Sequence, residues 1–255
     1  MKYKLKRIKS DASFRQFFRA YKGNQTSIIV FTNKDKFKNL EVYSSINKFL
    51  KKKGIYTPKL IYYQIDSGLI EIEDLGDNPL LTILNKTKDK LKYYKMCINL
   101  LIKLQKINPV ENISCISGKK YKLPKYDFNN LHKESDLFFD WYLKGIIGRK
   151  KSFKYKKIIK KELSVIYKKL YFKKYCLVHR DFHISNIMLF KGKLAVIDTQ
   201  DLIIGNRFYD LVSLLEDVRF KVPKKVKNQA LDFYLSKSSI KKKLFSKVKD
   251  DYDIL

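Results

Sequence analysis

The hydrophobic pattern of the first quarter of the chain predicts strands around a single helix. Residues 13–21 and 26–31 are rich in aromatic and β-branched side chains, and turn residues at 22–24 separate them, so they are expected to form a hairpin. Apolar residues then recur at helical spacing over 37–50, and Gly54 follows as a stop signal. A helix is therefore predicted after the hairpin.

Two more short strands complete this first region. Residues 60–63 and 69–73 are apolar and aromatic, and the turn residues at 66–68 lie between them. The expected order is strand, strand, helix, strand, strand.

The pattern changes after Gly76. Apolar residues recur at helical spacing over 91–107, 134–147 and 154–174, whereas 176–204 has the short apolar runs of strands. No internal repeat and no Gly/Ser-rich linker divides the chain, so the two regions are expected to pack together. The sequence predicts an α+β fold in which a small β-rich region precedes a mainly helical one.

Composition excludes other classes. The 255 residues carry 56 Lys and Arg against 25 Asp and Glu, a net charge of +31, yet 45% of them are hydrophobic. A disordered basic tail would lack that apolar content, so the chain is expected to fold. Of the basic residues 49 are Lys, spread over nearly every segment, whereas nucleic-acid readers concentrate Arg on one face. A genome rich in A/T codons would also produce an excess of Lys. Nucleic acid is therefore not the expected partner.

The cysteines and the N-terminal residues bear on the compartment. Cys97, Cys115 and Cys176 are far apart, which indicates neither a disulfide framework nor a zinc site. The first residues lack the apolar core of a secretory signal, and no apolar run approaches the roughly 18 residues of a membrane span. These features predict a cytoplasmic protein without a membrane segment, and they leave its oligomeric state open.

Residues 177–198 carry the candidate chemistry. Asp181 and Asn186 lie on a loop between apolar segments, and Asp198 follows a turn at 191–193 that joins two apolar strands. Such a hairpin brings the loop beside the end of the second strand. A carboxylate that accepts a hydroxyl proton, with an amide oxygen and a second carboxylate to bind Mg²⁺, is the set that phosphoryl transfer requires.

Residues 179–186 form the H-R-D-x-x-x-x-N loop of kinase catalytic cores, and Asp198 matches the metal-binding Asp that follows it. With its neighbours, the chain resembles the aminoglycoside phosphotransferase-like kinases, and among them most closely the bacterial N-acetylmuramate/N-acetylglucosamine anomeric kinases. The stretches that carry the resemblance run in the family's order: 10–15, 73–77, 137–143, 196–201 and 209–215.

The resemblance implies a bilobal protein-kinase-like fold, with an N-lobe at 1–75 and a C-lobe at 76–255. It also implies ATP-dependent phosphorylation of a sugar hydroxyl, the anomeric hydroxyl of N-acetylmuramate or N-acetylglucosamine in cell-wall recycling. In such an enzyme Asp181 would be the catalytic base, and Asn186 and Asp198 would hold Mg²⁺ against the phosphates.

Ser13 and Arg15 are expected to bind the nucleotide. The resemblance implies that the backbone of Glu73 and Leu75 would hydrogen-bond adenine. Asp210 would hold the catalytic loop through its backbone amides.

Three further expectations concern residues near the motif. His179 and Arg180 are expected to brace the catalytic loop. His183 is expected to hydrogen-bond locally, since no second His or Cys lies at metal-ligand spacing. Trp141 is expected in a helix core rather than in a sugar-stacking platform.

The chain departs from protein kinases in its nucleotide-binding residues. No Gly-rich loop is evident, and the strand at 28–31 contains no Lys, which argues against a protein kinase. Arg15 or Arg19 is the expected replacement cation, and Glu41 its expected partner.

The end of the chain leaves the acceptor open. Family members usually continue with a longer helical segment, whereas only residues 219–255 follow here. Another small-alcohol or aminoglycoside kinase and an inactive, nucleic-acid-binding kinase-like protein remain alternatives. The net charge of +31 suits an anionic sugar better than a polycationic antibiotic.

Overall fold

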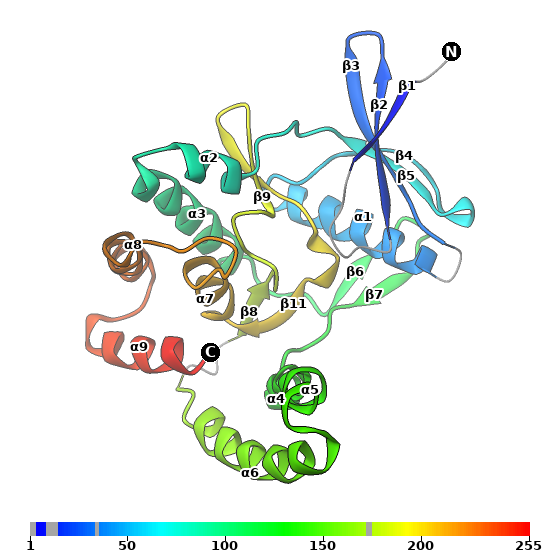
Figure 1. The fold of residues 1–255 in the computed structure, drawn as a ribbon. Coiled ribbons are helices and arrows are strands. Elements are labelled where there is room, and N and C mark those ends of the chain that lie inside the picture. Colours follow the sequence, from blue (N-terminus) through cyan, green and yellow to red (C-terminus); the bar gives the residue numbers. More distant parts are fainter. Residues whose placement is uncertain (1–3, 9–14, 34–35, 172–174) are drawn as a thin grey trace.

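The computed structural model of the protein describes residues 4–8, 15–33, 36–171 and 175–255. Its N-terminal region is an antiparallel sheet (Figure 1). In spatial order the strands are β1 (Lys4–Ile8), β2 (Gln16–Lys22), β3 (Gln25–Phe31), β5 (Leu69–Glu73) and β4 (Leu60–Gln64). The four predicted strands are confirmed, and β1 adds an edge strand, paired with β2, that the sequence analysis did not predict.

The predicted helix of this region is α1 (Phe37–Lys52), which covers one face of the sheet (Figure 1). Leu40 and Tyr43 of the helix are buried in one cluster with Val30 and Ile70 of the sheet. Burial of a Leu, Val or Ile side chain stabilises a fold by roughly 1.5–3 kcal/mol. The apolar face of α1 therefore fixes the helix on the sheet.

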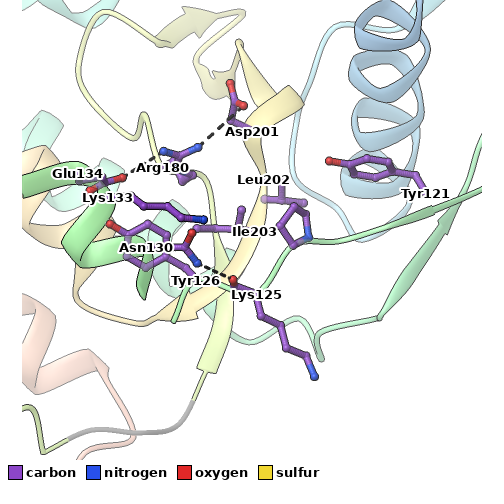
Figure 2. Close-up of a pocket in the computed structure, with 11 residues that line it drawn as sticks. Tyr121, Lys125, Tyr126, Asn130, Lys133, Glu134, Arg180, Asp201, Leu202 and Ile203 are labelled. Carbon is purple, nitrogen blue, oxygen red and sulfur yellow. Dashed lines mark hydrogen bonds and ion pairs between the residues drawn. The ribbon is translucent and has the colours of Figure 1, made fainter. Parts of the chain in front are cut away.

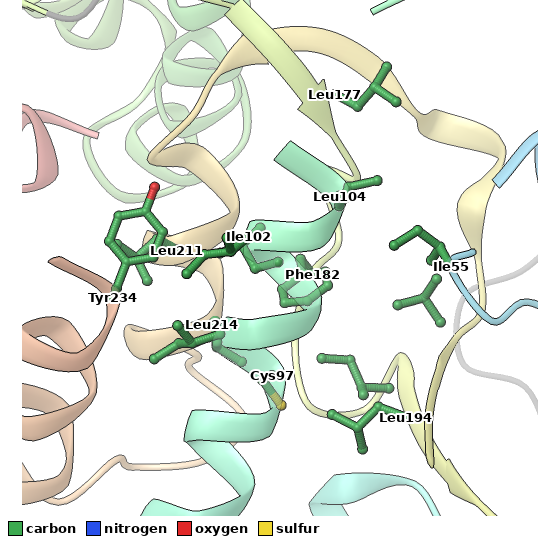
Figure 3. Close-up of a cluster of buried hydrophobic side chains, with 14 of the residues drawn as sticks. Ile55, Cys97, Ile102, Leu104, Leu177, Phe182, Leu194, Leu211, Leu214 and Tyr234 are labelled. Carbon is green, nitrogen blue, oxygen red and sulfur yellow. The ribbon is translucent and has the colours of Figure 1, made fainter. Parts of the chain in front are cut away.

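The remaining chain is built around the central helix α3 (Lys90–Gln105). Figure 3 shows Cys97 and Leu104 of this helix in one buried cluster with Leu214 and Tyr234 from later helices. The surrounding helices are α2 (Leu80–Lys86), α7 (Tyr209–Leu215), α8 (Lys224–Lys237) and α9 (Phe245–Ile254). The predicted α+β fold, with a small β-rich region before a mainly helical one, is confirmed. In the described ranges no helix is both long and apolar enough to cross a membrane.

Short antiparallel strand pairs connect the helices. They are β6 (Asn112–Ser114) with β7 (Lys120–Lys122), β8 (Tyr175–Val178) with β11 (Ile203–Asn206), and β9 (Ile187–Phe190) with β10 (Lys193–Val196). In the last pair Ile187 lies opposite Val196, and the turn contains Gly192 with φ +75°. The hairpin predicted around residues 191–193 is confirmed, and it brings the residues before β9 beside those after β10.

A helical hairpin extends from the body of the molecule (Figure 1). Its elements are α4 (Phe128–Leu137), a π-helical turn (Phe138–Leu143), α5 (Lys144–Ile147) and α6 (Arg149–Lys168). Helix α4 begins six residues before the predicted 134, because Asp127 caps it by accepting a hydrogen bond from the Asn130 backbone N–H. The helix predicted over residues 154–174 is α6, which begins earlier, at the residue after Gly148.

The prediction that Trp141 belongs to a helix core is wrong, because its side chain is 79% exposed. Ion pairs join the two arms of the hairpin, alongside aromatic ring contacts between α4 and α6: Lys156 pairs with Asp136 and Asp140, and Lys160 pairs with Asp136. Trp141 lies on the π-helical turn between the arms.

Candidate active site

The catalytic loop begins where β8 ends and is held by a buried carboxylate. Asp210, at the start of α7, accepts hydrogen bonds from the backbone N–H of His179 at 2.7 Å and of Arg180 at 3.0 Å. Burial raises the pKa of Asp210 to about 7, and the two N–H donors oppose that rise by favouring the carboxylate. The predicted role of Asp210 as a support for the loop is confirmed.

The two residues before Asp181 brace the loop, as predicted. The His179 ring donates from Nε2 to the Ile197 carbonyl at 3.0 Å, and burial lowers its pKa to about 4, so the ring is neutral at pH 7. Arg180 has a left-handed backbone conformation, with φ 74°, and its guanidinium donates to Glu134 of α4 at 3.1 Å. The loop is thereby tied both to the β10 end and to the helical hairpin.

Asn186 and Asp198 are brought together by the β9–β10 hairpin. The backbone N–H of Ile197 donates to the Asn186 carbonyl at 3.0 Å, so the two candidate metal ligands lie on adjacent strand ends. The Asn186 amide N–H donates to the Asp181 carbonyl and lies 3.2 Å from His183 Nε2. Among the described residues, no donor reaches the Asn186 Oδ1. The local hydrogen-bonding role predicted for His183 is confirmed by its contact with the Asn186 amide.

Asp198 adopts a left-handed conformation, with φ 61° and ψ 44°, and pairs with Arg15. Arg15 Nη2 lies 2.5 Å from Asp198 Oδ1, and Nη1 donates to Gln200 Oε1 at 2.9 Å. The residue is only 7% exposed. Of the two arginines proposed as replacement cation, Arg15 is the one that reaches the candidate metal site.

The donor set at this point suits Mg²⁺. The Asn186 Oδ1 and the Asp198 carboxylate are hard oxygen donors on adjacent strand ends, and the Asn186 oxygen has no protein partner among the described residues. The described chain contains no cluster of three or more His, Cys, Asp or Glu side chains that could hold a metal. Magnesium commonly takes one or two protein ligands and completes its shell with phosphate oxygens and water, so two donors are compatible with it.

The surroundings of Asp181 disfavour its charged form. It is partly buried, and desolvation, helped by the negative charges of Asp198 and Asp201, raises its pKa above the ordinary value. The cations of Arg180 and Arg219 act in the opposite direction. A carboxylate with a raised pKa accepts a proton more readily than an ordinary one.

A cleft separates the sheet from the catalytic hairpin, and most of the candidate nucleotide residues line it. Its polar residues include Asn186 and Asp198, and its apolar wall includes side chains from both sides. The residues that line the cleft include Arg15, Arg19, Ile28, Ile72, Glu73, Leu75, Asp77, Asn186, Met188 and Asp198. The structure therefore brings Arg15, Glu73, Leu75, Asn186 and Asp198 to one cleft, whereas Ser13 lies outside the described residues.

The end of β5 and the segment after it offer backbone groups to the cleft. The Glu73 N–H donates to the Lys59 carbonyl at 2.8 Å, and the Glu73 carboxylate accepts from the Tyr56 hydroxyl at 2.8 Å. Its side chain thus supports the segment. Within the described part of the chain, the backbone N–H of Leu75 has no acceptor.

The expectation that Glu41 pairs with the replacement cation is wrong. Glu41 accepts a hydrogen bond from the Ser117 backbone N–H at 3.1 Å, and among the described residues it forms no ion pair with either arginine. Arg19 pairs instead with Asp74 and Asp77, at 2.7 Å each. The sequence analysis did not predict that Gln200 contacts Arg15 or that Glu134 contacts Arg180, because these partners are far apart in the chain.

The sheet, the cleft and the loop at 179–186 define a protein-kinase-like phosphotransferase fold. Two solved structures share it: an ADP-bound aminoglycoside phosphotransferase, APH(2'')-Ib (TM-score 0.72, 17% identity, 98% of this chain and 81% of that one), and a Plasmodium vivax ethanolamine kinase (TM-score 0.67, 15% identity, 99% and 72%). The bilobal kinase-like fold that the resemblance implied is confirmed. The sequence profile of the phosphotransferase enzyme family matches residues 4–241, so the chain belongs to that family.

Curated relatives are similar over most of this chain. The N-acetylmuramate/N-acetylglucosamine kinase of Neisseria meningitidis serogroup B is 28% identical over 211 residues, which are 82% of this chain and 60% of that protein. The enzyme of the same name from Pseudomonas aeruginosa is 27% identical over 231 residues, 90% of this chain and 64% of that protein. The chain thus spans less than two thirds of the length of these relatives.

Proposed function

We propose that this chain is a kinase that transfers the γ-phosphate of ATP to a sugar hydroxyl, with residues 1–75 and 76–255 as its two lobes. One observation carries the proposal: Asn186 and Asp198 lie on adjacent strand ends in the cleft, and Asp181 lies on the same loop as Asn186. A base and two metal ligands in this order are the parts that phosphoryl transfer needs, because the chemistry depends on positioning and charge neutralisation.

The nucleotide would lie in the cleft between the sheet and the hairpin. Ile28, Ile72 and Met188 offer apolar contacts to a planar base, and the free backbone N–H of Leu75 offers a hydrogen-bond donor. The Glu73 carbonyl is the proposed acceptor beside it.

The phosphates would meet Arg15 and the metal ligands. Arg15 is the proposed counter-cation, with Ser13 in the same nucleotide-binding set, and Asn186 and Asp198 are the proposed Mg²⁺ ligands. When bound, Mg²⁺ supplies neutralisation of the phosphate charge. Arg15 would exchange part of its contact with Asp198 for phosphate oxygens.

Asp181 is the proposed general base. Its carboxylate would accept the proton of the sugar hydroxyl while the hydroxyl oxygen forms a bond to the γ-phosphorus. The bond between that phosphorus and the β–γ bridging oxygen breaks, and ADP leaves with that oxygen. The raised pKa of Asp181 supports this role.

The proposed acceptor is the anomeric hydroxyl of N-acetylmuramate or N-acetylglucosamine. Both curated relatives described above are named N-acetylmuramate/N-acetylglucosamine kinase, and each aligns with more than four fifths of this chain. The net charge of +31 favours the acidic sugar of the two, since it attracts a carboxylate to the surface.

A panel of free sugars, ATP and Mg²⁺ tests the proposal. Formation of sugar 1-phosphate is measured for N-acetylmuramate, N-acetylglucosamine, glucose and an aminoglycoside, with Asp181→Asn as the inactive control. Turnover of the two N-acetylated sugars, lost in the variant, is expected. Turnover of the aminoglycoside alone would refute the sugar assignment, and absence of turnover on every acceptor would refute the kinase assignment.

A further inference from the structure

A cavity of about 250 Å³ lies at the end of the β8–β11 pair that is farther from the catalytic loop. The loop leaves β8 at Val178, whereas the cavity is lined by Tyr175 and Cys176 at the start of that strand and by Arg207, the residue after β11. None of its lining residues also lines the nucleotide cleft or the cavity beside Arg180 that Figure 2 shows. The proposed phosphoryl-transfer site therefore does not account for it.

The other walls of this cavity come from the end of α3, the residues that follow it and the turn after α8. Apolar and polar groups lie side by side there, from Lys106, Ile107, Asn108, Pro109, Ser238 and Ser239. Among the described residues that line the cavity, none is Asp or Glu. Its volume is slightly below the usual range of small-molecule sites, about 300–1,000 Å³, so it suits a compact ligand.

Arg207 is anchored by its Nε and its backbone, whereas its two Nη groups are open. The Nε–H donates to the Tyr234 hydroxyl at 3.3 Å, the guanidinium lies 5.8 Å from the centre of the Phe208 ring, and the Arg207 carbonyl accepts from the Gln105 amide at 2.6 Å. Within the described ranges no carboxylate pairs with Arg207, and neither Nη group has an acceptor. The residue is partly buried, yet its Nη groups are accessible. A fixed cation therefore presents open N–H donors to the cavity.

The general excess of Lys does not explain a cation at this position. Of the 56 basic residues 49 are Lys, spread over nearly every segment, so an exposed Lys by itself indicates no site. An Arg that is partly buried without a carboxylate partner is different, because its planar guanidinium can bind two oxygens of one phosphate at once.

Two neighbouring residues offer further donors. Lys106 is exposed and forms no ion pair within the described part of the chain. Ser239 follows α8, and neither its backbone N–H nor its hydroxyl has an acceptor among the described residues. Together with Arg207, the donors thus come from three separate elements around the cavity. A phosphate presents three oxygens in different directions, whereas a carboxylate presents two in one plane, so this arrangement favours phosphate.

We propose that this cavity binds a phosphate group, free or carried by a small ester, and that Arg207 and Lys106 bind its oxygens. The site lies apart from the nucleotide cleft and goes beyond the proposed kinase activity. It needs no turnover, because binding alone tests it.

Calorimetric titration of the whole protein at low salt tests the binding, with an excess of a non-hydrolysable ATP analogue and Mg²⁺ to fill the nucleotide cleft. The probes are inorganic phosphate, glucose 6-phosphate, glucuronate as a sugar carboxylate and glucose as an uncharged comparison. At least one phosphate probe is expected to bind, and more tightly than glucuronate. Binding of inorganic phosphate alone identifies free phosphate as the source, and tighter binding of glucose 6-phosphate identifies an ester. Tighter binding of glucuronate, or no heat from either phosphate probe, would overturn the proposal.

Variants of Arg207 locate the binding, whether or not the ATP analogue binds. Arg207→Ala should weaken phosphate binding about tenfold or more, as expected for the loss of a charge-assisted hydrogen bond. Arg207→Lys should restore part of the affinity, because it keeps the charge but not the planar fork. Arg149→Ala is the matched control, since Arg149 is exposed at the start of α6 and does not line the cavity. Equal losses in Arg207→Ala and Arg149→Ala would assign the binding to net charge and overturn the proposal.

Lys106→Gln keeps the proposal testable if Arg207→Ala disturbs the packing against Tyr234. Lys106 is exposed, so its replacement should leave the fold intact, and Lys157→Gln at an exposed position of α6 removes the same charge as a control. A ligand that binds only the folded protein raises its Tm. Phosphate is expected to raise the Tm of the wild type and of Lys157→Gln more than that of Lys106→Gln. The same rise in all three proteins would overturn the assignment of Lys106 to the site.

Discussion

Arg15 and Asp198 form a 2.5 Å ion pair that joins the N-terminal sheet to the catalytic hairpin. Arg15 lies immediately before β2, and Asp198 lies two residues after β10. The cation that the strand at 28–31 lacks is thus delivered from the neighbouring strand, and it already contacts the carboxylate proposed to bind Mg²⁺. Arg15 should therefore contribute both to nucleotide affinity and to the geometry of Asp198.

Replacement of Arg15 by Ala tests this relationship. We expect the KM for ATP to rise and kcat to fall, by about tenfold or more together, because a hydrogen bond to a charged group contributes about 1.5–3 kcal/mol. Arg15→Lys keeps the charge but not the two-pronged contact with Asp198 and Gln200, so an intermediate loss is expected. Steady-state kinetics measures both parameters.

Arg7→Ala is the control for Arg15→Ala, because Arg7 is exposed on β1 and carries the same charge. It should leave both constants nearly unchanged. Equal KM and kcat in Arg15→Ala and the wild type would remove Arg15 from the nucleotide site.

Replacement of Asp181 by Asn separates base catalysis from nucleotide binding. We expect kcat to fall by about 10²- to 10⁴-fold, the usual contribution of a general base. ADP affinity should stay the same, since Asp181 does not line the cleft. The raised pKa of Asp181 also predicts that wild-type kcat/KM falls on the acid side at a pH above the ordinary value of that carboxyl. A variant that retained activity, or that lost ADP binding in calorimetry, would contradict this assignment.

The sequence could predict features that depend on neighbours in the chain. The hairpin of β9 and β10 is an example, because two short apolar runs around Gly192 are sufficient to place Asn186 beside Asp198. The support of the loop by Asp210 was predictable only through the resemblance to a known family, since the bond joins residues far apart in the sequence.

Features that depend on distant partners could not be read from local patterns. Nothing near Glu134 indicates that it receives Arg180, and the pattern around Trp141 is that of an ordinary amphipathic helix. Trp141 is exposed on the π-helical turn, while α4 meets α6 through ion pairs and ring contacts elsewhere along the two helices. Which face of a helix is buried depends on what packs against it, and a single sequence does not contain that information.

The buried His179 ring makes the free energy of unfolding depend on pH. Burial lowers its pKa from 6.5 to about 4, so between these values the unfolded chain binds a proton that the folded protein does not. Stability from this group is full above pH 6.5 and is lost as pH falls toward 4. His179→Gln has no such titration, so the wild type should lose about 2 kcal/mol relative to it between pH 7 and pH 5. Urea unfolding at several pH values measures the difference in unfolding free energy between the wild type and His179→Gln. Asp210 is present in both proteins, so its own titration cancels from this difference. A pH-independent difference would show that His179 is not held neutral.

At Gly68, a single added methyl group is expected to disturb the junction of the sheet and α1. Its φ of +66° is left-handed, and an added Cβ would overlap the Phe37 ring and the Thr32 carbonyl. Gly23 is the matched control, because its φ is +58° but nothing lies within 4 Å of the added Cβ. Both Ala variants carry a backbone strain of roughly 1–2 kcal/mol, and Gly68→Ala should lose a further 1–3 kcal/mol, by rough analogy with overpacked cores. Equal urea-unfolding free energies for the two variants would contradict the close packing of β5 against α1 at this turn.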